Sequence, residues 1–533
     1  MTVQSFLDRA ASLLGPDAVV REEQALAALT TCTTGAHRAI AGAVYPASTE
    51  QVQQIVALAR ERNVALYAVS TGHNWGYGSA SPVVDGCILL SLARMRALEV
   101  DAELGIAIVE PGVTQRQLAD HFDANGLPFM VPTTGAGPEA SLVGNALERG
   151  YGITPITDHF AAVMSLEAVL PDGTRYESPI AAAGAPGVSR VYKWGIGPYV
   201  DGLFAQGAFG IVTKMTIALA RRPEAAKAFL FGLRDDRLLE AAVAAIREVL
   251  ARLPGTVGGV NLMNDRRVLA MSVPYPHHKL GPDGLIAESA LRDDAQRLRI
   301  HPWTGFGMLY GTAGVVAAAI REVRKHLKPI ASGMLFVSPA AAQRLTRIAS
   351  AVPTLRARFG PKLRTLESAL ELVGGRPNET ALPLAYWKSG RRPPPGMPLD
   401  PARDGCGLIW YAPLLEMSPD RAREYVQHVS TTMQRHRLEP LITLSSLSER
   451  CFGSSIPILF DPANRTESEA ACACHLALLE GGLRNGFFPY RIGIDAMGWL
   501  ASQRERNAGF LEFGSALKRS VDPASILSPG RYV

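Results

Sequence analysis

The chain has 533 residues, of which 47% are hydrophobic and 19% are charged, so a disordered protein is excluded and two or three folded domains are expected. The formal net charge of +5 is spread without a basic stripe, which gives no support to nucleic-acid binding. The six cysteines form no disulfide framework, no apolar run reaches the ~20 residues of a membrane span, and the first residues lack a signal-peptide pattern. We therefore expect a cytoplasmic protein without a membrane or nucleic-acid partner.

Strand-like and helix-like segments alternate in the first half of the chain. Residues 50–63 carry apolar side chains near helical spacing behind a cap at Ser48 and Thr49, which predicts a helix. Residues 64–70, 87–92, 97–113 and 161–177 have the pattern of strands joined by tight turns. The pattern indicates an α+β unit that is rich in strands.

The composition changes near residue 225. Ala-rich segments at 236–253 and 314–327 predict long helices, and helices are expected to dominate from this point. The Pro-rich segment at 389–405 predicts an exposed, semi-rigid loop. From about residue 485 the chain returns to mixed polar and aromatic motifs that are typical of active sites.

Two glycine-rich segments place polar side chains beside predicted strands. The first, YAVSTGHNWGYGSASP at 67–82, contains His73, and the second, at 131–160, contains Asn145. Neither has the fingerprint of a P-loop or a Rossmann fold, but both suit backbone amides that wrap a pyrophosphate in an extended loop. The alternative for each segment is an ordinary surface turn or packing corner.

No metal site is expected from the histidine and cysteine pattern. CACH at 472–475 and HH at 277–278 each lack the partner pair that a tetrahedral zinc site requires. The helical spacing of Cys472 and His475 in an Ala/Leu-rich run favours core packing instead.

Seven ordered sequence blocks resemble one family of flavoproteins along nearly the whole chain. They are STGHNWGYGSASP, VEPGVT, LVGNALERGYGITPITDH, GIGPYVDGLFAQGAFGIVTKMTI, DGCGLIWYAP, YRIG and VDPASILSPG. The chain thereby resembles the vanillyl-alcohol oxidase and para-cresol methylhydroxylase (PCMH) superfamily. The resemblance implies an α+β fold with a PCMH-type FAD-binding domain at 1–224, an inserted α+β cap domain at 225–484, and a C-terminal segment at 485–533 that returns to the FAD domain.

The resemblance also implies FAD as the cofactor. The expected cofactor-binding residues are Ser70, Thr71, Gly72, His73, Asn74, Pro132, Gly135, Ser141, Gly144, Asn145, Gly152, Ile211, Val212 and Arg531. His73 stands where a histidine in several branches bonds covalently to the flavin, and a neutral imidazole is a competent nucleophile for that step. The alternative is that His73 only hydrogen-bonds the flavin.

A second covalent tether is not expected. In the phenol-oxidising relatives the tether comes from the cap domain, and the matching position in this chain is Gly407. Because glycine has no side chain to form the bond, a covalent link would come from His73, or FAD is held without one.

On the substrate side, the resemblance implies that Tyr77, Tyr490 and Arg491 gather a phenolic oxygen and that Asp158 acts near flavin N5 as a base or electrostatic group. An arginine and two phenol hydroxyls around one oxygen favour its anionic form. The alternative is that Tyr490 and Arg491 are rim residues without a common target. Trp410 and Tyr411 are expected to line the cap side of the cavity.

The expected function is hydride transfer from the benzylic carbon of a para-substituted phenol to flavin N5, with reoxidation by oxygen or an electron-transfer protein. Oxidation of a non-phenolic alcohol or amine is one alternative, and a flavin-binding protein without turnover is another. The family further suggests a homodimer or a larger assembly.

Overall fold

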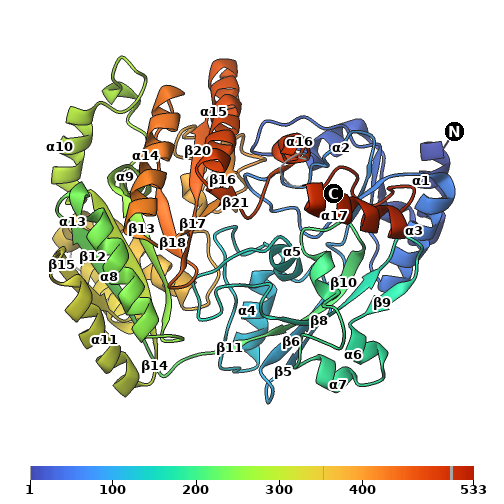
Figure 1. Ribbon diagram of the computed structural model, residues 1–533, viewed down its shortest axis with the longest axis horizontal. Coiled ribbons are helices and arrows are strands. Elements are labelled where there is room, and N and C mark those ends of the chain that lie inside the picture. The colour runs from blue at the N-terminus through green and yellow to red at the C-terminus, as the bar shows by residue number, and fades with distance from the viewer. Residues whose placement is uncertain (1, 352, 504–507, 533) are drawn as a thin grey trace.

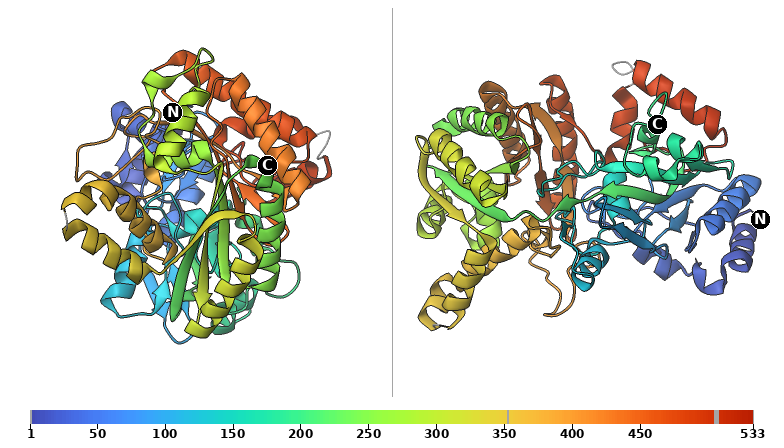
Figure 2. Two further views of the ribbon diagram at one scale, coloured as in Figure 1. Left: turned by 90° about the vertical axis from the view of Figure 1, so that its left-hand side faces the viewer. Right: turned by 90° about the horizontal axis from the view of Figure 1, so that it is seen from below.

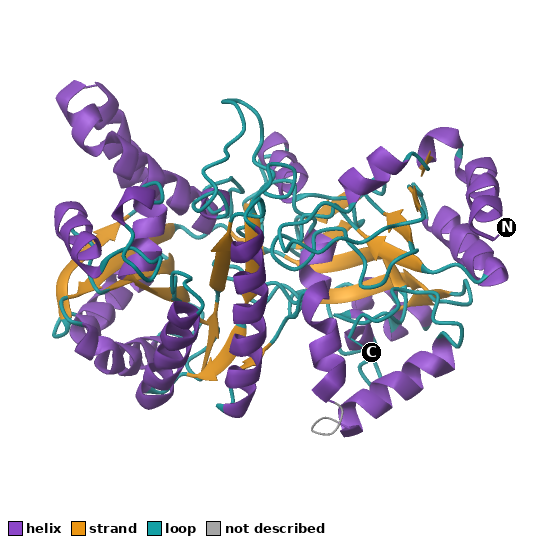
Figure 3. Ribbon diagram, turned by 90° about the horizontal axis from the view of Figure 1, so that it is seen from above, coloured by secondary structure: helices purple, strands orange, loops and turns teal. Residues whose placement is uncertain are grey.

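The computed structural model describes residues 2–351, 353–503 and 508–532, and these form two lobes that lie side by side (Figure 1). The N-terminal lobe contains two small sheets and the central lobe contains one large sheet. The view from below shows the C-terminal helices packed back on the N-terminal lobe (Figure 2). Loops are concentrated where the lobes meet (Figure 3).

The first sheet has the strand order β1-β2-β4-β3 and is parallel except for β1. Helix α3 (Thr49–Arg62) confirms the predicted helix, because the Ser48 side chain caps it by accepting a hydrogen bond from the Gln51 amide. Val52 and Ile55 of α3 pack in a core with Phe6 of α1 (Thr2–Leu14). The strands are β1 (Val19–Val20), β2 (Gly42–Val44), β3 (Leu66–Val69) and β4 (Ile88–Ser91), and α2 (Glu23–Leu29) lies between β1 and β2 in the chain.

The second sheet is antiparallel, with the order β5-β6-β10-β8-β9. Its strands are β5 (Leu98–Asp101), β6 (Ile106–Val109), β8 (Val163–Val169), β9 (Arg175–Glu177) and β10 (Ile211–Ala218). Helices α4 (Gln115–Ala124) and α5 (Leu142–Leu147) pack on it through apolar side chains, and α6 (Pro179–Ala182) and α7 (Pro186–Ser189) follow β9. These elements confirm the strands that alternation predicts in the first half.

The central lobe is built on an eight-stranded sheet with the order β15-β12-β14-β13-β18-β19-β17-β21. Helices still hold most of the regular structure between residues 225 and 484, as expected. The large sheet itself was not predicted, because glycine-rich and mixed strands such as Trp303–Gly311 lack a clean period of two. The strands are β12 (Ala225–Leu233), β13 (Val257–Asn264), β14 (Trp303–Gly311), β15 (Ala331–Val337), β17 (Pro413–Glu416), β18 (Thr443–Ser446), β19 (Cys451–Ser454) and β21 (Phe488–Pro489).

Helices cover the large sheet and confirm the two that composition predicts. Helix α8 (Leu239–Arg252) packs against α11 (Ala313–Leu327) and α14 (Pro419–Arg435), and their apolar faces share one core with the sheet. The remaining helices are α9 (Asp265–Ser272), α10 (Glu288–Leu298), α12 (Pro339–Ala351), α13 (Pro353–Val373) and α15 (Arg465–Arg484). In α15, His475 is buried as predicted, whereas Cys472 is exposed, so core packing is wrong for that cysteine.

A separate ribbon joins the two lobes. Strands β16 (Gly407–Tyr411) and β20 (Ile456–Phe460) pair with each other, and the Trp410 amide donates to the Gly76 carbonyl of the first glycine-rich segment at 3.1 Å. Strands β7 (Phe129–Met130) and β11 (Ala220–Arg221) form a second short pair. The Pro-rich segment before β16 is an exposed loop over residues 391–398, as predicted.

The C-terminal segment returns to the first sheet after α16 (Met497–Ser502) and α17 (Ala508–Val521). The Leu66 amide donates to the Ile526 carbonyl, and the Ser528 amide donates to the Leu66 carbonyl, each at 2.7 Å. The buried Lys518 ammonium donates to Asp522 Oδ2 at 2.6 Å and to the carbonyls of Ala208 and Leu527. This ion pair fixes the returning segment beside the β10 end of the second sheet.

The domain boundaries at 224 and 484 stay a prediction. The large sheet starts with β12 at Ala225, but its edge strand β21 lies beyond residue 484 and pairs with β17. Within the described ranges, no helix is both long and apolar enough to cross a membrane.

Replacing Lys518 with Met leaves the Asp522 carboxylate, which is 2% exposed, without its cation. Breaking a buried pair in this way is expected to lower the free energy of unfolding by about 3 kcal/mol. Arg519→Met is the matched control, because Arg519 is exposed on the same helix, and it should change stability by less than ~0.5 kcal/mol. Urea unfolding measures both variants, and equal effects would show that the ion pair does not hold the segment.

Candidate active site

A cavity of about 490 Å³ lies between the lobes. The N-terminal lobe contributes both glycine-rich segments and the first residues of β10 to its wall. The central lobe contributes residues of β13, β16 and β18, and the C-terminal part contributes residues 490–491 and residues within 527–531. Segments that are hundreds of residues apart in sequence therefore face one space.

The first glycine-rich segment packs closely against the central lobe and the C-terminal part of the chain. A Cβ atom at Gly76 would lie 2.2 Å from Trp410 Cδ1, and one at Gly78 would lie 2.6 Å from Ile494 Cγ1. Both glycines also have positive φ angles of 74° and 114°. These positions need glycine because the backbone must turn where the central lobe and the C-terminal segment contact it.

The second glycine-rich segment packs against the first and is hydrogen-bonded to it. Ser141 caps α5 by accepting from the Gly144 amide at 3.0 Å, and its own amide donates to Thr71 Oγ1 at 3.2 Å. A Cβ atom at Gly144 would lie 2.3 Å from Ser70 Oγ. The two segments form one surface of small residues with backbone close to the cavity.

Most of the predicted cofactor-binding residues line this cavity. They are Ser70, Thr71, Gly72, His73, Asn74, Gly135, Ser141, Gly144, Asn145, Ile211, Val212 and Arg531. The structure does not place Pro132 or Gly152 in the lining. A Cβ atom at Gly152 would instead contact His159 and the Thr133 carbonyl, so Gly152 allows these groups to pack closely against the backbone.

The His73 ring lies in the wall and stacks on Trp75, with ring centroids 5.0 Å apart and planes at 17°. Burial lowers the pKa of His73 below its ordinary 6.5, although Asp400 and Glu139 act in the opposite direction. The imidazole is therefore neutral near pH 7 and keeps a nitrogen lone pair.

A buried carboxylate that sequence reasoning did not single out organises the charged part of the wall. Glu148 forms ion pairs with Arg531 and, at 3.3 Å, with Arg491. Arg531 also donates to Tyr67 Oη at 2.9 Å. Burial alone would raise the pKa of Glu148, but Arg531 and Arg491 outweigh it and hold the pKa below its ordinary 4.5. Glu148 lies in the LVGNALERG block at the end of α5, and its only sequence signal is a charge among small residues.

Tyr77, Tyr490 and Arg491 meet in the cavity as predicted. The Arg491 guanidinium lies 4.2 Å over the Tyr77 ring and donates to Asn74 Oδ1. Burial raises the pKa of both tyrosines, so both hydroxyls stay protonated. Among the described residues, neither hydroxyl has a hydrogen-bond partner, which leaves both donors available to a ligand.

Asp158 is not in the cavity wall. Its Oδ1 accepts a hydrogen bond from the Ala161 amide at 2.9 Å, and its backbone pairs with that of Tyr151, which does line the cavity. Asp158 thus lies beside a wall residue without lining the cavity itself, and its predicted role near the reacting carbon stays a prediction.

Strand β16 corrects one expectation, that Tyr411 lines the cavity. Gly407 does not face the cavity, because a Cβ atom there would point into the Phe460 backbone oxygen at 2.4 Å. Tyr411, on the same face of the strand, is fully buried in the central core, whereas Trp410 lines the cavity as predicted. Side chains alternate along a strand, so the cavity receives Leu408 and Trp410, and neither offers the nucleophilic atom of a tether.

The central lobe contributes polar residues for which the sequence gave no motif. They are Asn261, Arg267, Thr443, Ser445 and Ser455. Gln206, also missed, donates to the Tyr490 carbonyl at 3.0 Å. No short motif marks these positions, since each becomes a wall residue only through strand pairing across the large sheet.

Comparison with known proteins agrees with this geometry. Residues 40–178 match the family described as FAD binding domain. The chain is 35% identical over 524 residues to 1'-carboxy-chondrochloren decarboxylase of Chondromyces crocatus, covering 98% of this chain and 95% of that protein. It is 27% identical over 525 residues to the flavoprotein subunit of 4-cresol dehydrogenase [hydroxylating] of Pseudomonas putida, covering 98% and 93%.

Solved structures give the same result. A crystal structure of p-cresol methylhydroxylase with substrate bound superposes with a TM-score of 0.87 at 25% identity, covering 99% of this chain and 96% of that one. The fold and the FAD-binding segment define an FAD-dependent oxidoreductase. The chain belongs to the PCMH-type flavoprotein family.

The wall fits FAD on its own chemistry. The small residues at 70–72, 141 and 144 line the cavity without filling it, and Arg531 contributes a cation to the same wall, which suits a dinucleotide with a diphosphate. The residues that would hold FAD thus come mainly from the N-terminal lobe and the returning C-terminal segment, and the assignment of the central lobe as a cap stays a prediction.

Replacing Glu148 with Gln removes the charge that Arg491 and Arg531 share and should cost about 3 kcal/mol of unfolding free energy at pH 7. Because its pKa is lowered on folding, Glu148 contributes this stability in full above pH 4.5, and the contribution falls as the pH drops through the lowered pKa. Denaturant unfolding at pH 7 and between pH 4.5 and 3 tests this. Glu139→Gln, at an exposed ion pair, is the control, and a wild-type advantage independent of pH would contradict the assignment.

Proposed function

We propose that this enzyme oxidises para-substituted phenols by hydride transfer from the benzylic carbon to flavin N5. The observation that carries the proposal is the cluster of Tyr77, Tyr490 and Arg491 around one part of the cavity. It supplies a fixed cation and two protonated hydroxyls that have no partner among the described residues.

This cluster favours a phenolate. A cation and two hydrogen-bond donors around one phenolic oxygen stabilise the charged form and lower the pKa of the ligand. Glu148 does not cancel the effect, because it is shared between Arg491 and Arg531 and leaves the group with a net positive charge. A phenolate releases electron density through the ring, which makes loss of hydride from the para-benzylic carbon easier.

Bound FAD would supply the hydride acceptor. Loss of hydride converts the phenolate into a quinone methide, which can add water or, where the next carbon carries a carboxylate, lose carbon dioxide and regain the phenolate. The names of the two full-length relatives, a hydroxylating dehydrogenase and a decarboxylase, correspond to these two outcomes. The proposal therefore concerns the oxidation step that both outcomes share.

The wider context stays a prediction. Reoxidation by oxygen or by an electron-transfer protein, a dimeric or larger assembly, and a cytoplasmic location are all expected on the grounds given above. A non-phenolic alcohol or amine substrate, or a flavin protein without turnover, are the alternatives that the next experiments separate.

A 4-alkylphenol should reduce the flavin under anaerobic conditions, and its methyl ether should react at least ~100-fold more slowly, since the ether cannot become a phenolate. Stopped-flow flavin bleaching measures both rates. Equal rates for the phenol and its ether would indicate a non-phenolic substrate, and a flavin that stays oxidised with every donor would indicate a protein without turnover.

Arg491→Met should lower kcat/KM for the phenol by about 30- to 150-fold, the equivalent of a lost charge-assisted hydrogen bond of about 2–3 kcal/mol. The same stopped-flow measurement tests this variant.

We further propose that His73 is covalently bonded to the flavin. Acid precipitation of the wild-type protein should then leave flavin in the pellet, whereas His73→Ala should release it to the supernatant. His278→Ala, an exposed histidine outside the cavity, is the control and should retain the flavin. Flavin in the pellet of the His73→Ala variant would show that another residue is the tether, and release from the wild type would leave His73 as a hydrogen-bonding residue.

A further inference from the structure

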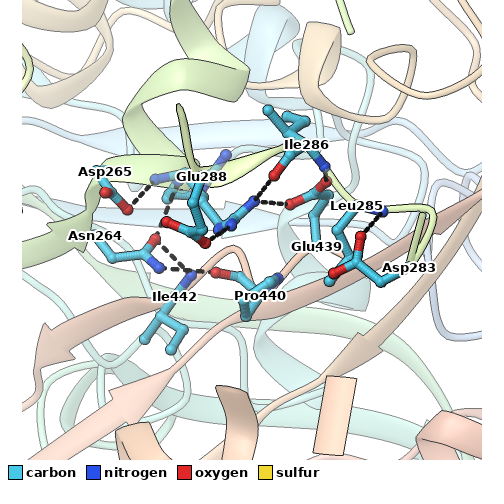
Figure 4. A network of polar contacts seen from close by, with 11 residues as sticks. Asn264, Asp265, Asp283, Leu285, Ile286, Glu288, Glu439, Pro440 and Ile442 are labelled. Carbon is cyan, nitrogen blue, oxygen red and sulfur yellow. Dashed lines mark hydrogen bonds and ion pairs between the residues drawn. The ribbon is translucent and has the colours of Figure 1, made fainter. Parts of the chain in front are cut away.

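Helix α9 carries two consecutive arginines in very different environments. Arg266 lies in a closed polar network with Glu439 and Glu288, and Glu439 also accepts from the Ile286 amide at 2.6 Å (Figure 4). Its charge is thus balanced by two carboxylates. Arg267, the next residue, lines the substrate cavity instead.

Arg267 has no carboxylate partner in the described part of the chain. Its Nε donates to Thr443 Oγ1 at 3.2 Å, and its Nη1 atom is enclosed without a hydrogen-bond partner. Burial lowers the pKa of Arg267 to about 10, so the side chain is still charged at neutral pH. An enclosed cation without a counter-charge is costly, by several kcal/mol, and such charges are normally paired or bound to a ligand.

The surroundings of Arg267 are suited to an anionic oxygen group. Thr443 and Ser445 are alternate residues of β18, so they lie on the same face of the strand, and Ser445 pairs with Asn261 of the adjacent strand β13. These three residues and Ser455 line the same cavity and offer amide and hydroxyl donors. The cavity wall holds three arginines but a single carboxylate, Glu148, and that carboxylate is already bound to Arg491 and Arg531. Arg267 is the one of the three that it does not neutralise.

Arg267 also has different side-chain partners from Arg491. The Arg491 guanidinium contacts Asn74, Glu148 and Tyr77, whereas the Arg267 guanidinium donates to Thr443, so the two guanidiniums share no partner among these residues. The apolar side chains of Leu408 and Trp410 line the same cavity. Two cationic sites and an apolar wall correspond to a ligand with an anion at each end and an apolar middle.

We propose that Arg267 binds a carboxylate on the para substituent of the substrate, so that the natural substrates are phenols with an acidic side chain. The planar guanidinium fork matches a carboxylate in two parallel hydrogen bonds, and Asn261 and Ser445 supply further donors. This inference rests on the proposed phenol oxidation and extends it to the far end of the substrate.

The test uses the FAD-loaded enzyme with 4-hydroxycinnamate and 4-hydroxycinnamamide. Neither has an sp³ benzylic hydrogen, so binding is read from the change in the flavin absorbance spectrum without turnover. The wild type should bind the acid at least 10-fold more tightly than the amide. Arg267→Met should weaken acid binding by 10- to 100-fold, to the level of the amide, and leave amide binding within about 2-fold. Arg267→Lys should retain part of the preference, because it keeps the charge but loses the fork.

Arg435→Met, at an exposed arginine of α14, is the matched control and should keep the wild-type preference. Equal wild-type affinity for acid and amide would overturn the inference without any variant. Equal loss of both ligands in Arg267→Met would overturn it as well, and loss of FAD from that variant would assign Arg267 to the cofactor phosphates instead. Failure of both a 4-alkylphenol and 3-(4-hydroxyphenyl)propanoate, which has a carboxylate and benzylic hydrogens, to bleach the flavin would refute the proposed oxidation, and an intact acid preference would still support the carboxylate site.

Discussion

The active site depends on the buried carboxylate of Glu148. It lies at the end of α5, beside the glycine-rich segments, and it binds two arginines that arrive from the C-terminal part of the chain. Through Arg531 the network reaches Tyr67 on β3, and through Arg491 it reaches Asn74 in the first glycine-rich segment. One carboxylate therefore couples the returning segment to both glycine-rich segments and β3, and Arg491 is in position only when that segment has folded back.

The same network determines what each arginine of the cavity can do. Arg531 is held between Glu148 and Tyr67, which suits a fixed cation beside the cofactor. Arg491 shares Glu148 and stacks on the Tyr77 ring. Arg267 pairs with no carboxylate of the described residues. The charge of the wall is thus left to be balanced by ligands, and the substrate that we propose, with a phenolate at one end and a carboxylate at the other, would supply charges of the required sign.

Close backbone packing, rather than a phosphate-binding helix, shapes the cofactor surface. Gly76 and Gly78 allow the first segment to contact Trp410 and Ile494, and Gly144 lets the second segment reach Ser70. A side chain at these positions would separate the lobes or the two segments. Gly76, Gly78 and Gly144 are therefore required by contacts between distant parts of the chain as well as by the cofactor.

The sequence by itself determined the family, the cofactor and the set Tyr77, Tyr490 and Arg491 that meets in the cavity, because these depend on short blocks such as STGHNWGYGSASP and YRIG in which residue type and spacing are fixed together. It also determined local elements such as α3, whose cap and apolar period are contained in one segment. Only the tertiary structure decided the eight-stranded sheet, the burial of Tyr411 and the orientation of Gly407 away from the cavity, since one step along a strand moves a side chain to the opposite face. The partners of Glu148 and the solitary charge of Arg267 were likewise decided by tertiary contacts, because an arginine paired with carboxylates and one without them look the same in the sequence, as Arg266 and Arg267 show.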